Sequence, residues 1–235
     1  MNGSRLLKIV TLIIFVVAFA FFEFDFFNEK ENEKDIVSFD SNNIPDYSGE
    51  DIIILNNNEP DFGNISGVDE SFELYGELDN LGRCTSAIAN IGYDLMPTEK
   101  RERISDIKPS GFRLIKYDII KDGLYLYNRC HLIGYQLTAE NSNEKNLITC
   151  TRHMNAELME PYESKVGSYI RKTKNHVLYR VTPIFDGNNP IAKGAEMEAL
   201  SIEDNGEGIK FHIFVYNVQP GIEINYENGD SKLIQ

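Results

Sequence analysis

Residues 125–137 read YLYNRCHLIGYQL, and the period-2 spacing of aromatic and aliphatic residues predicts a half-buried β-strand. Because successive side chains of a strand point to opposite faces, Arg129 and His131 project from the same face. A guanidinium beside an imidazole is costly inside an apolar core, whereas both groups suit the surroundings of a phosphate. This face of the strand is therefore the first candidate for a functional site.

Strand patterns also occur on both sides of this stretch. RLIKYDII (113–120) precedes LYLYNRCHLIG (124–134), and the Lys121-Asp122-Gly123 connection between them predicts a β-hairpin. Three further strands are predicted later in the chain, at HVLYRVTPIF (176–185), EMEALSIE (196–203) and IKFHIFVYNV (209–218).

A central helix is predicted between these two groups of strands. The run TAENSNEKNLITCTRHMNAELME (138–160) changes from a polar loop to helical spacing. Pro161 suits the first turn of a helix, and Val166, Tyr169 and Ile170 follow at helical intervals. Strands, a helical stretch and strands again predict an α+β fold with a mostly antiparallel central sheet and flanking helices.

The net charge of −14 hides an uneven distribution. Residues 23–75 hold 15 acidic and 2 basic residues, whereas residues 99–180 hold 10 acidic and 15 basic residues. The acidic, Asn-rich segment is typical of a disordered spacer. The net charge of the whole chain therefore does not exclude a nucleic-acid partner.

The N-terminal residues predict export. Arg5 and Lys8 precede an apolar run from Ile9 to Phe22, the pattern of a signal anchor or a cleaved signal peptide, and Ala18-Phe19-Ala20 resembles a cleavage site. We expect three regions: residues 1–27 as this anchor or signal peptide, residues 28–73 as the disordered linker, and residues 74–235 as the folded domain. The predicted location is the extracellular face of the cell membrane, held through the apolar segment, or the secreted fraction.

Three cysteines leave one thiol unpaired if a disulfide forms, and we expect the pair Cys84–Cys130, with the other pairings left open. A thiol nucleophile at Cys130 is disfavoured, because Cys130 and His131 point to opposite faces of one strand. No cysteine pair has the C-x-x-C spacing of a zinc site, and no histidine lies in an HExxH motif.

Three separated motifs, NRCHLIGYQL, NEKNLITCTRHMN and PYESKV, occur in the order found in the DNA/RNA non-specific endonuclease family. About residues 76–230 resemble this family of ββα-metal (His-Me finger) nucleases, particularly exported bacterial surface nucleases. In this resemblance, Arg129 and His131 correspond to the arginine and histidine of the family's Asp-Arg-Gly-His motif. Asn128 and Cys130 depart from that motif, which puts rate and pH optimum in question more than reaction type.

The resemblance also implies an activity and its residues. The expected enzyme is a Mg²⁺-dependent endonuclease, with Mn²⁺ as a substitute, that hydrolyses phosphodiester bonds of DNA and RNA without sequence specificity. Its catalytic set is His131 as general base, Arg129 as phosphate clamp, Glu163 near the metal-bound waters and Asn146 as a brace. Asn155 matches the asparagine that binds the metal.

Substrate contacts are expected through phosphates, because the chain carries no motif that reads base edges. Arg129 and the basic segment with Lys100, Arg101, Arg103 and Lys108 are the predicted nucleic-acid contacts, and no protein partner is inferred. The main alternative is a surface nucleic-acid-binding or uptake protein that keeps the fold without the reaction. A second alternative is an effector that attacks the nucleic acid of competing cells.

Overall fold

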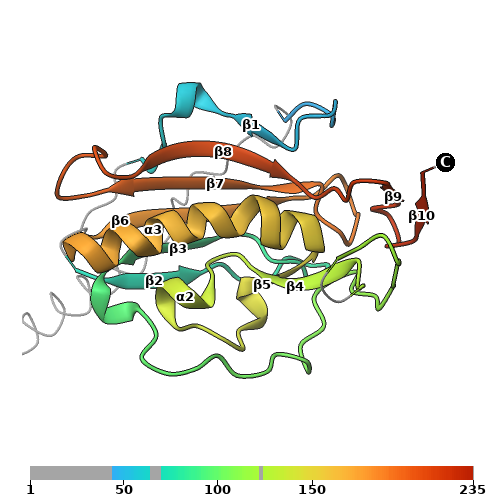
Figure 1. Ribbon diagram of the computed structural model, residues 1–235, viewed down its shortest axis with the longest axis horizontal. Helices are drawn as coiled ribbons and strands as arrows, with labels where there is room; N and C mark the ends of the chain where they lie inside the picture. Colours follow the sequence, from blue (N-terminus) through green and yellow to red (C-terminus); the bar gives the residue numbers. More distant parts are fainter. Residues whose placement is uncertain (1–43, 64–69, 122–123, 235) are drawn as a thin grey trace, which may run out of the picture. The chain divides into compact units, whose positions relative to one another are not determined.

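The centre of the computed structural model, which describes residues 44–63, 70–121 and 124–234, is a six-stranded sheet (Figure 1). The strand order is β1-β8-β7-β6-β3-β2, and every neighbouring pair is antiparallel. The strands are β1 (Ile52–Ile54), β2 (Phe72–Tyr75), β3 (Ala87–Ile91), β6 (Val177–Ile184), β7 (Gly194–Ser201) and β8 (Lys210–Tyr216). The last three lie within two residues of the predicted runs, so those predictions are confirmed.

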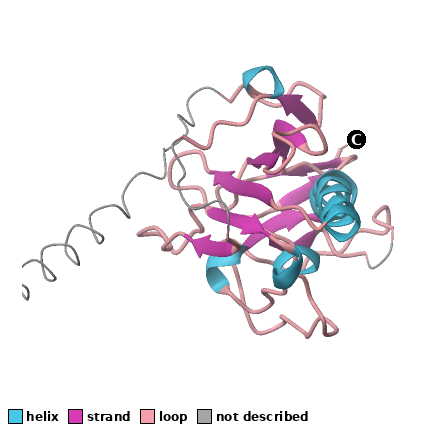
Figure 2. Cartoon of the chain, turned by 90° about the vertical axis from the view of Figure 1, so that its left-hand side faces the viewer, coloured by secondary structure: helices cyan, strands magenta, loops and turns pink. Residues whose placement is uncertain are grey.

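One face of the sheet packs against helix α3 (Glu160–Thr173), as Figure 2 shows from the side. Alternate strand residues such as Tyr179 and Met197 share a buried core with Val166 and Ile170 of the helix. Pro161 stands in the first turn of α3, which confirms the predicted helix start. The apolar residues at alternate strand positions therefore pack against the apolar face of the helix.

The opposite face carries a row of charged side chains. Arg180, Glu198 and His212 are paired in register across β6, β7 and β8, and all three are buried. Residues 44–63, which we call the N-terminal strap and which include β1, contact this row through Asp61. The backbone N–H of Asp61 donates to Glu198 Oε1 at 2.8 Å, and Arg180 Nη2 donates to the Asp61 carbonyl at 2.6 Å.

A strand–strand–helix unit lies beside the sheet. Strands β4 (Tyr127–His131) and β5 (Leu147–Thr151) pair with each other, and the π-helix η6 (Met154–Met159) leads directly into α3. The smaller elements are η3 (Asn56–Asn58), η4 (Tyr93–Leu95), α2 (Tyr135–Thr138), η5 (Glu144–Asn146), β9 (Ile222–Ile224) and β10 (Ser231–Leu233). This order confirms the ββα arrangement and the α+β fold class.

The prediction that residues 113–120 form a strand paired with β4 is wrong. Residues 113–120 do not form a strand, and only an isolated bridge between Lys116 and Tyr125 joins the two segments. β5 takes the place beside β4 because all of its residues are buried, whereas Leu114 and Ile119 are 70% and 53% exposed. Burial of apolar surface favours the pairing with β5.

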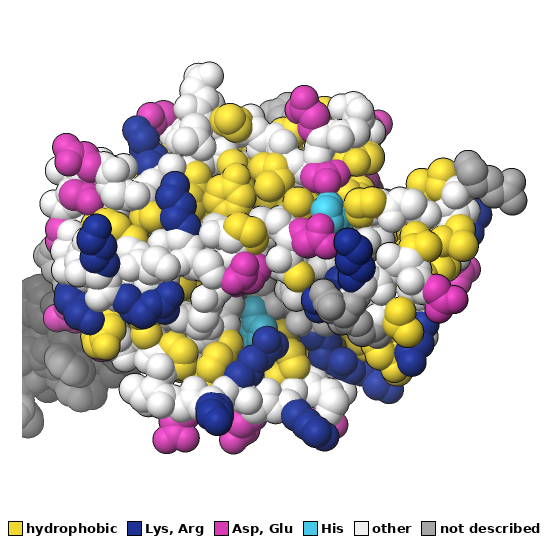
Figure 3. Space-filling model, viewed as in Figure 1, with side chains coloured by type: hydrophobic (Ala, Val, Ile, Leu, Met, Phe, Trp, Pro, Cys, Tyr) yellow, Lys and Arg dark blue, Asp and Glu magenta, His cyan; other side chains and the backbone are white. Residues whose placement is uncertain are grey.

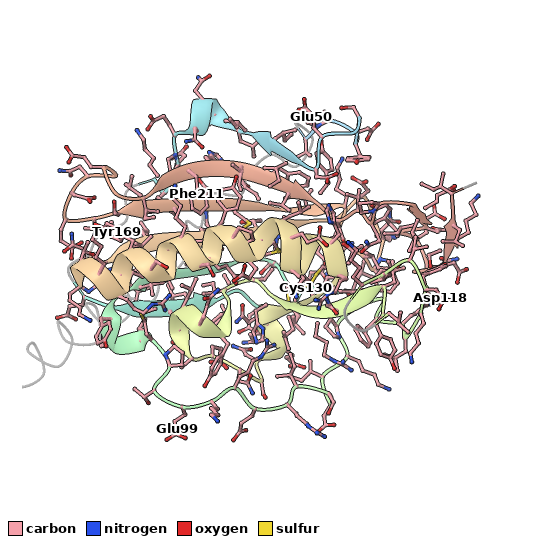
Figure 4. The ribbon with its side chains drawn as sticks, in the orientation of Figure 1. Glu50, Glu99, Asp118, Cys130, Tyr169 and Phe211 are labelled. Atoms are coloured by element: carbon pink, nitrogen blue, oxygen red, sulfur yellow. A yellow bond between two sulfur atoms is a disulfide. The ribbon has the colours of Figure 1, made fainter. Side chains whose placement is uncertain are left out.

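The expected Cys84–Cys130 disulfide is also wrong. Cys130 and Cys150 form the disulfide, since the pairing of β4 with β5 brings their Cα atoms to 5.9 Å (Figure 4). Cys84 is a buried free thiol that contacts the carbonyl oxygens of Glu144 and Leu147 at 3.2 Å. Burial raises the pKa of this thiol to about 11.

The predicted disordered linker, residues 28–73, overlaps the strap. Strand β1 in the strap pairs with β8 at the edge of the main sheet, so the prediction of disorder is wrong for Ile52–Ile54. The predicted anchor at residues 1–27 lies outside the described residues. Among the helices that the structure describes, none has the length and apolar character needed to cross a membrane.

Candidate active site

His131 ends strand β4 and is 6% exposed. Its Nε2 lies 2.9 Å from the carbonyl oxygen of Asn141, which only accepts hydrogen bonds, so Nε2 carries the hydrogen. Its Nδ1 lies 3.2 Å from Nη2 of Arg101, a donor, so Nδ1 presents its lone pair. Burial, reinforced by the positive charge of Arg101 and opposed by the Asn141 carbonyl, lowers the pKa of His131 to about 4.

Arg101 reaches His131 from a loop, residues 97–112, that we call the basic loop. Arg129, two residues before His131, holds this loop in place. Its guanidinium donates to the carbonyl oxygens of Ile107 and, at 2.8 Å, Ser105, and stacks on the Phe112 ring at 4.1 Å. The guanidinium that faces His131 is therefore that of Arg101, while Arg129 fixes the loop that carries it.

Glu163 projects from α3 and is buried. Burial, with the Glu160 charge, raises its pKa to about 7, against the lowering effects of Gln136, the Gly134 amide and Arg101. A Cβ atom on Gly134 would lie 2.3 Å from Glu163 Oε2, so only glycine permits this close approach. Arg101 thus interacts electrostatically with both His131 and Glu163.

Asn146 is fully buried directly before β5. Its Oδ1 accepts from the backbone N–H of Ile133 at 2.9 Å, and its Nδ2 donates to the Ile133 carbonyl at 3.0 Å. These two bonds fix the chain between His131 and Gly134.

Asn155 lies in the π-helix η6, eight positions before Glu163 along the chain. The backbone N–H of Glu160 donates to the Asn155 carbonyl, the wider turn that defines a π-helix. Pro161 has no N–H to continue the regular helical pattern, which accounts for the wide turn at this point. No hydrogen bond joins the Asn155 side chain to another residue of the described ranges, so its amide oxygen is available to a ligand.

Three further predicted contacts, Lys100, Arg103 and Lys108, are exposed on the basic loop. None of them forms an ion pair within the part of the chain that the structure describes. In Figure 3, Lys and Arg side chains (dark blue) gather along the lower part of the face, where a histidine (cyan) reaches the surface. Figure 4 marks the same loop by Glu99.

A second cluster has the residue types of a metal site. Among the described residues, Glu196, Glu198 and His212 place potential ligand atoms within 4.8 Å of one another. Arg180 pairs with Glu198 at 2.5 Å, and His212 Nε2 lies 2.5 Å from Glu196 Oε1. Arg180 and His212 already contact the two carboxylates, so we interpret the cluster as structural.

The structure brings together His131, Arg101 and Glu163, and places Asn146 behind them. Sequence reasoning treated Arg101 only as a nucleic-acid contact and missed its position on His131. It also missed Gly134 and the carbonyl of Asn141, because neither residue belongs to a chemically distinctive type. Arg129 and His131 do share one face of β4, as their spacing indicated.

Three solved nuclease structures are similar in fold to this chain. NucA from Streptococcus agalactiae with magnesium ion bound has a TM-score of 0.69 and 23% identity, over 78% of this chain and 88% of that chain. Sda1 nuclease with bound zinc ion has a TM-score of 0.60 and 29% identity, over 70% and 80% of the two chains. A protein described as an extracellular nuclease has a TM-score of 0.55 and 21% identity, over 72% and 97%.

The strand–strand–helix unit, with a buried histidine at the end of its first strand, defines a ββα nuclease fold. The sequence model of the DNA/RNA non-specific endonuclease family matches residues 64–202. This chain belongs to that family, as the three motifs of the sequence indicated.

Proposed function

We propose that this protein is an extracellular, metal-dependent endonuclease that hydrolyses DNA and RNA with His131 as the general base. The observation that carries the proposal is the contact between His131 and Arg101. Nδ1 of His131, which presents its lone pair, lies 3.2 Å from Nη2 of Arg101. This contact supports the proposal that a base and a phosphate-binding cation act at one point. The family membership supports the nuclease reaction, and the similarity to a protein described as an extracellular nuclease supports the location.

His131 is suited to take a proton from water. Its lowered pKa, about 4, keeps the imidazole neutral at pH 7, and the Asn141 carbonyl fixes the tautomer. The water oxygen bonds to phosphorus, its proton passes to Nδ1, and the bond from phosphorus to the 3′ oxygen breaks. The leaving 3′ oxygen takes up a proton from a solvent water. The products carry a 5′-phosphate and a 3′-hydroxyl.

Arg101 is the group best placed to bind the scissile phosphate. A phosphate drawn to this guanidinium lies beside Nδ1 of His131, and binding it turns the Arg101 N–H groups from the imidazole to the substrate. Arg129 would position Arg101 through the basic loop, in addition to its predicted role as a phosphate clamp. Phosphates further along the substrate would contact Lys100, Arg103 and Lys108.

Two observations fit a hard divalent cation near Asn155 and Glu163. Asn155 offers an amide oxygen without a hydrogen-bond partner in the described chain, and Glu163 is a buried carboxyl with a pKa raised to about 7. Asn155 would hold the ion, and Glu163 would orient its waters. When bound, Mg²⁺ supplies positive charge that stabilises the transition state and the leaving oxygen.

The test is cleavage of supercoiled plasmid and of RNA by the full chain, with Mg²⁺, Mn²⁺ or EDTA. We expect cleavage of both substrates with either ion, and its loss in EDTA with recovery when excess Mg²⁺ is added. A gel shift on the same samples distinguishes a nuclease from a protein that only binds nucleic acid. Binding without cleavage under every ion would contradict the nuclease proposal and favour the nucleic-acid-binding alternative.

A further inference from the structure

The N-terminal strap makes a contact that reaches the candidate active site, although it precedes the family match at residues 64–202. Asp51 stands directly before β1, and its carbonyl accepts from the Tyr216 N–H at 2.9 Å. The two oxygens of its carboxylate accept from Tyr47 Oη and from Nε2 of His153, both at 2.8 Å. The strap therefore holds Asp51 from two sides and aims one oxygen at His153.

His153 directly precedes the π-helix that carries Asn155. Its second ring nitrogen, Nδ1, contacts Glu157 Oε2 at 3.0 Å, one turn further along the chain. Its backbone N–H donates to Gln219 Oε1 at 3.1 Å. The imidazole is thus clamped between the strap and the π-helix, two residues from the predicted metal ligand.

A π-helix is less favourable than an α-helix, so its geometry depends on the groups that restrain it. At the start of the π-helix, the Met154 N–H donates to Thr151 Oγ1, at the end of β5, at 2.9 Å. Asp51 adds a restraint from a part of the chain about 100 positions away in sequence. Losing it would leave the His153 imidazole with its contact to Glu157, inside the same helical segment, and the turn with its backbone hydrogen bonds to Gln219 and Thr151.

We propose that the N-terminal strap is a positioning element of the nuclease site, acting through Asp51 and His153 on the turn that presents Asn155. This inference rests on the proposed metal role of Asn155. It replaces the expectation that the acidic N-terminal segment is only a spacer, at least for residues 44–63. Asp51 touches no reacting atom, and its effect is on the metal site.

The test compares Asp51→Ala with Tyr47→Phe in the full chain. Tyr47→Phe removes a hydrogen bond to the same carboxylate but leaves the contact with His153 intact. Calorimetric titration with Mn²⁺, without nucleic acid, is expected to give about 10-fold weaker binding for Asp51→Ala and unchanged binding for Tyr47→Phe. The Mg²⁺ concentration for half-maximal plasmid cleavage should rise by the same factor.

Two more variants separate positioning from folding. Asp51→Asn keeps the shape and an acceptor oxygen, and we expect it to recover most of the Mn²⁺ affinity. His153→Leu cuts the same contact from the other side and should weaken Mn²⁺ binding as Asp51→Ala does. Wild-type affinity in Asp51→Ala or His153→Leu, even with a lower melting temperature, would overturn the proposal.

The outcome for wild type distinguishes this inference from the proposed function. Wild type that binds Mn²⁺ without cleaving nucleic acid would contradict the nuclease activity, while weaker binding by Asp51→Ala would still support the strap. Wild type that cleaves with metal but shows equal Mn²⁺ affinity in all variants would overturn only the strap.

Discussion

Two buried histidines of this chain have pKa values shifted in opposite directions. At the candidate site, burial and the Arg101 charge lower the pKa of His131 to about 4. Under the strap, burial also lowers the pKa of His212, but hydrogen bonds to Glu196 and the Glu59 carbonyl outweigh it and raise the pKa overall. His131 and His212 are 6% and 3% exposed, and burial acts to lower both pKa values; the carboxylate beside His212, which His131 lacks, reverses the direction of the shift.

The difference separates a reactive region from a structural one. Under the strap each charge has an opposite partner, as Glu198 has in Arg180. At the site, a cation adjoins the neutral His131, and Glu163 is buried with its pKa raised to about 7. Groups whose pKa values are shifted by burial and neighbouring charge are candidates for proton transfer and metal binding.

The largest expected effect is on the cleavage rate, when each of the two histidines is replaced in turn. His131→Ala should lower the plasmid cleavage rate by about 100- to 10,000-fold, because a positioned general base contributes that much. His212→Asn should instead lower the melting temperature and leave the rate per folded molecule within a few fold. Rates and melting curves on both variants test this. A large rate loss in folded His212→Asn would break the comparison.

The next effect is on stability under the strap. Glu198→Gln leaves Arg180 buried without its charged partner, and we expect a loss of about 3–5 kcal/mol in the free energy of unfolding. The double variant Arg180→Met, Glu198→Leu should recover much of it, since neither charge is then buried. Urea unfolding of the three proteins measures both. Equal stability of Glu198→Gln and wild type would mean that the pair is not structural.

The sequence predicted the elements that rest on repeating patterns. β6, β7 and β8 direct apolar residues toward α3 at alternate positions, α3 buries one helical face, and the strand parity placed Arg129 with His131. β5 was missed because LITCT is a continuous buried run without alternation. β1 was missed because three isoleucines among acidic residues become a strand only beside the edge of β8.

The missed parts of the site depend on tertiary contacts. Arg101 lies on a loop without periodicity, and its contact with His131 forms between positions 30 residues apart. The approach of Gly134 to Glu163 depends on how α3 packs against the chain after β4. No local pattern encodes either contact, so sequence supplied the residue types and the fold supplied their partners.

A pH series sharpens the contrast within the active site. Between pH 6.5 and 4 the unfolded chain protonates His131 and the folded chain does not, so this group lowers stability as pH falls. Between pH 7 and 4.5 only the folded chain protonates Glu163, so this group raises stability as pH falls. Each shift corresponds to about 3 kcal/mol, and the two largely cancel in the wild type.

Single variants should reveal the opposing slopes. Glu163→Gln removes the compensating group, and its free energy of unfolding should fall relative to wild type as pH is lowered from 7 to 4. His131→Asn should show the opposite trend. Urea unfolding without metal over this range is the measurement. Parallel pH curves for the two variants and wild type would show that these groups keep ordinary pKa values.

The smallest expected effect concerns charge on the basic loop. Lys100 and Lys108 are exposed on the basic loop that carries Arg101, whereas Lys232 lies on β10. Each lysine that contacts a phosphate should contribute about 0.9 to the slope of log affinity against log salt for duplex DNA.

Binding of DNA by variants made in the His131→Ala background, measured in EDTA between low and moderate salt, isolates this contribution. Lys100→Ala and Lys108→Ala should each weaken binding a few fold and flatten the slope, and Lys232→Ala should not. An equal effect of all three variants would place DNA binding in the overall charge of the domain and not on the loop beside the base.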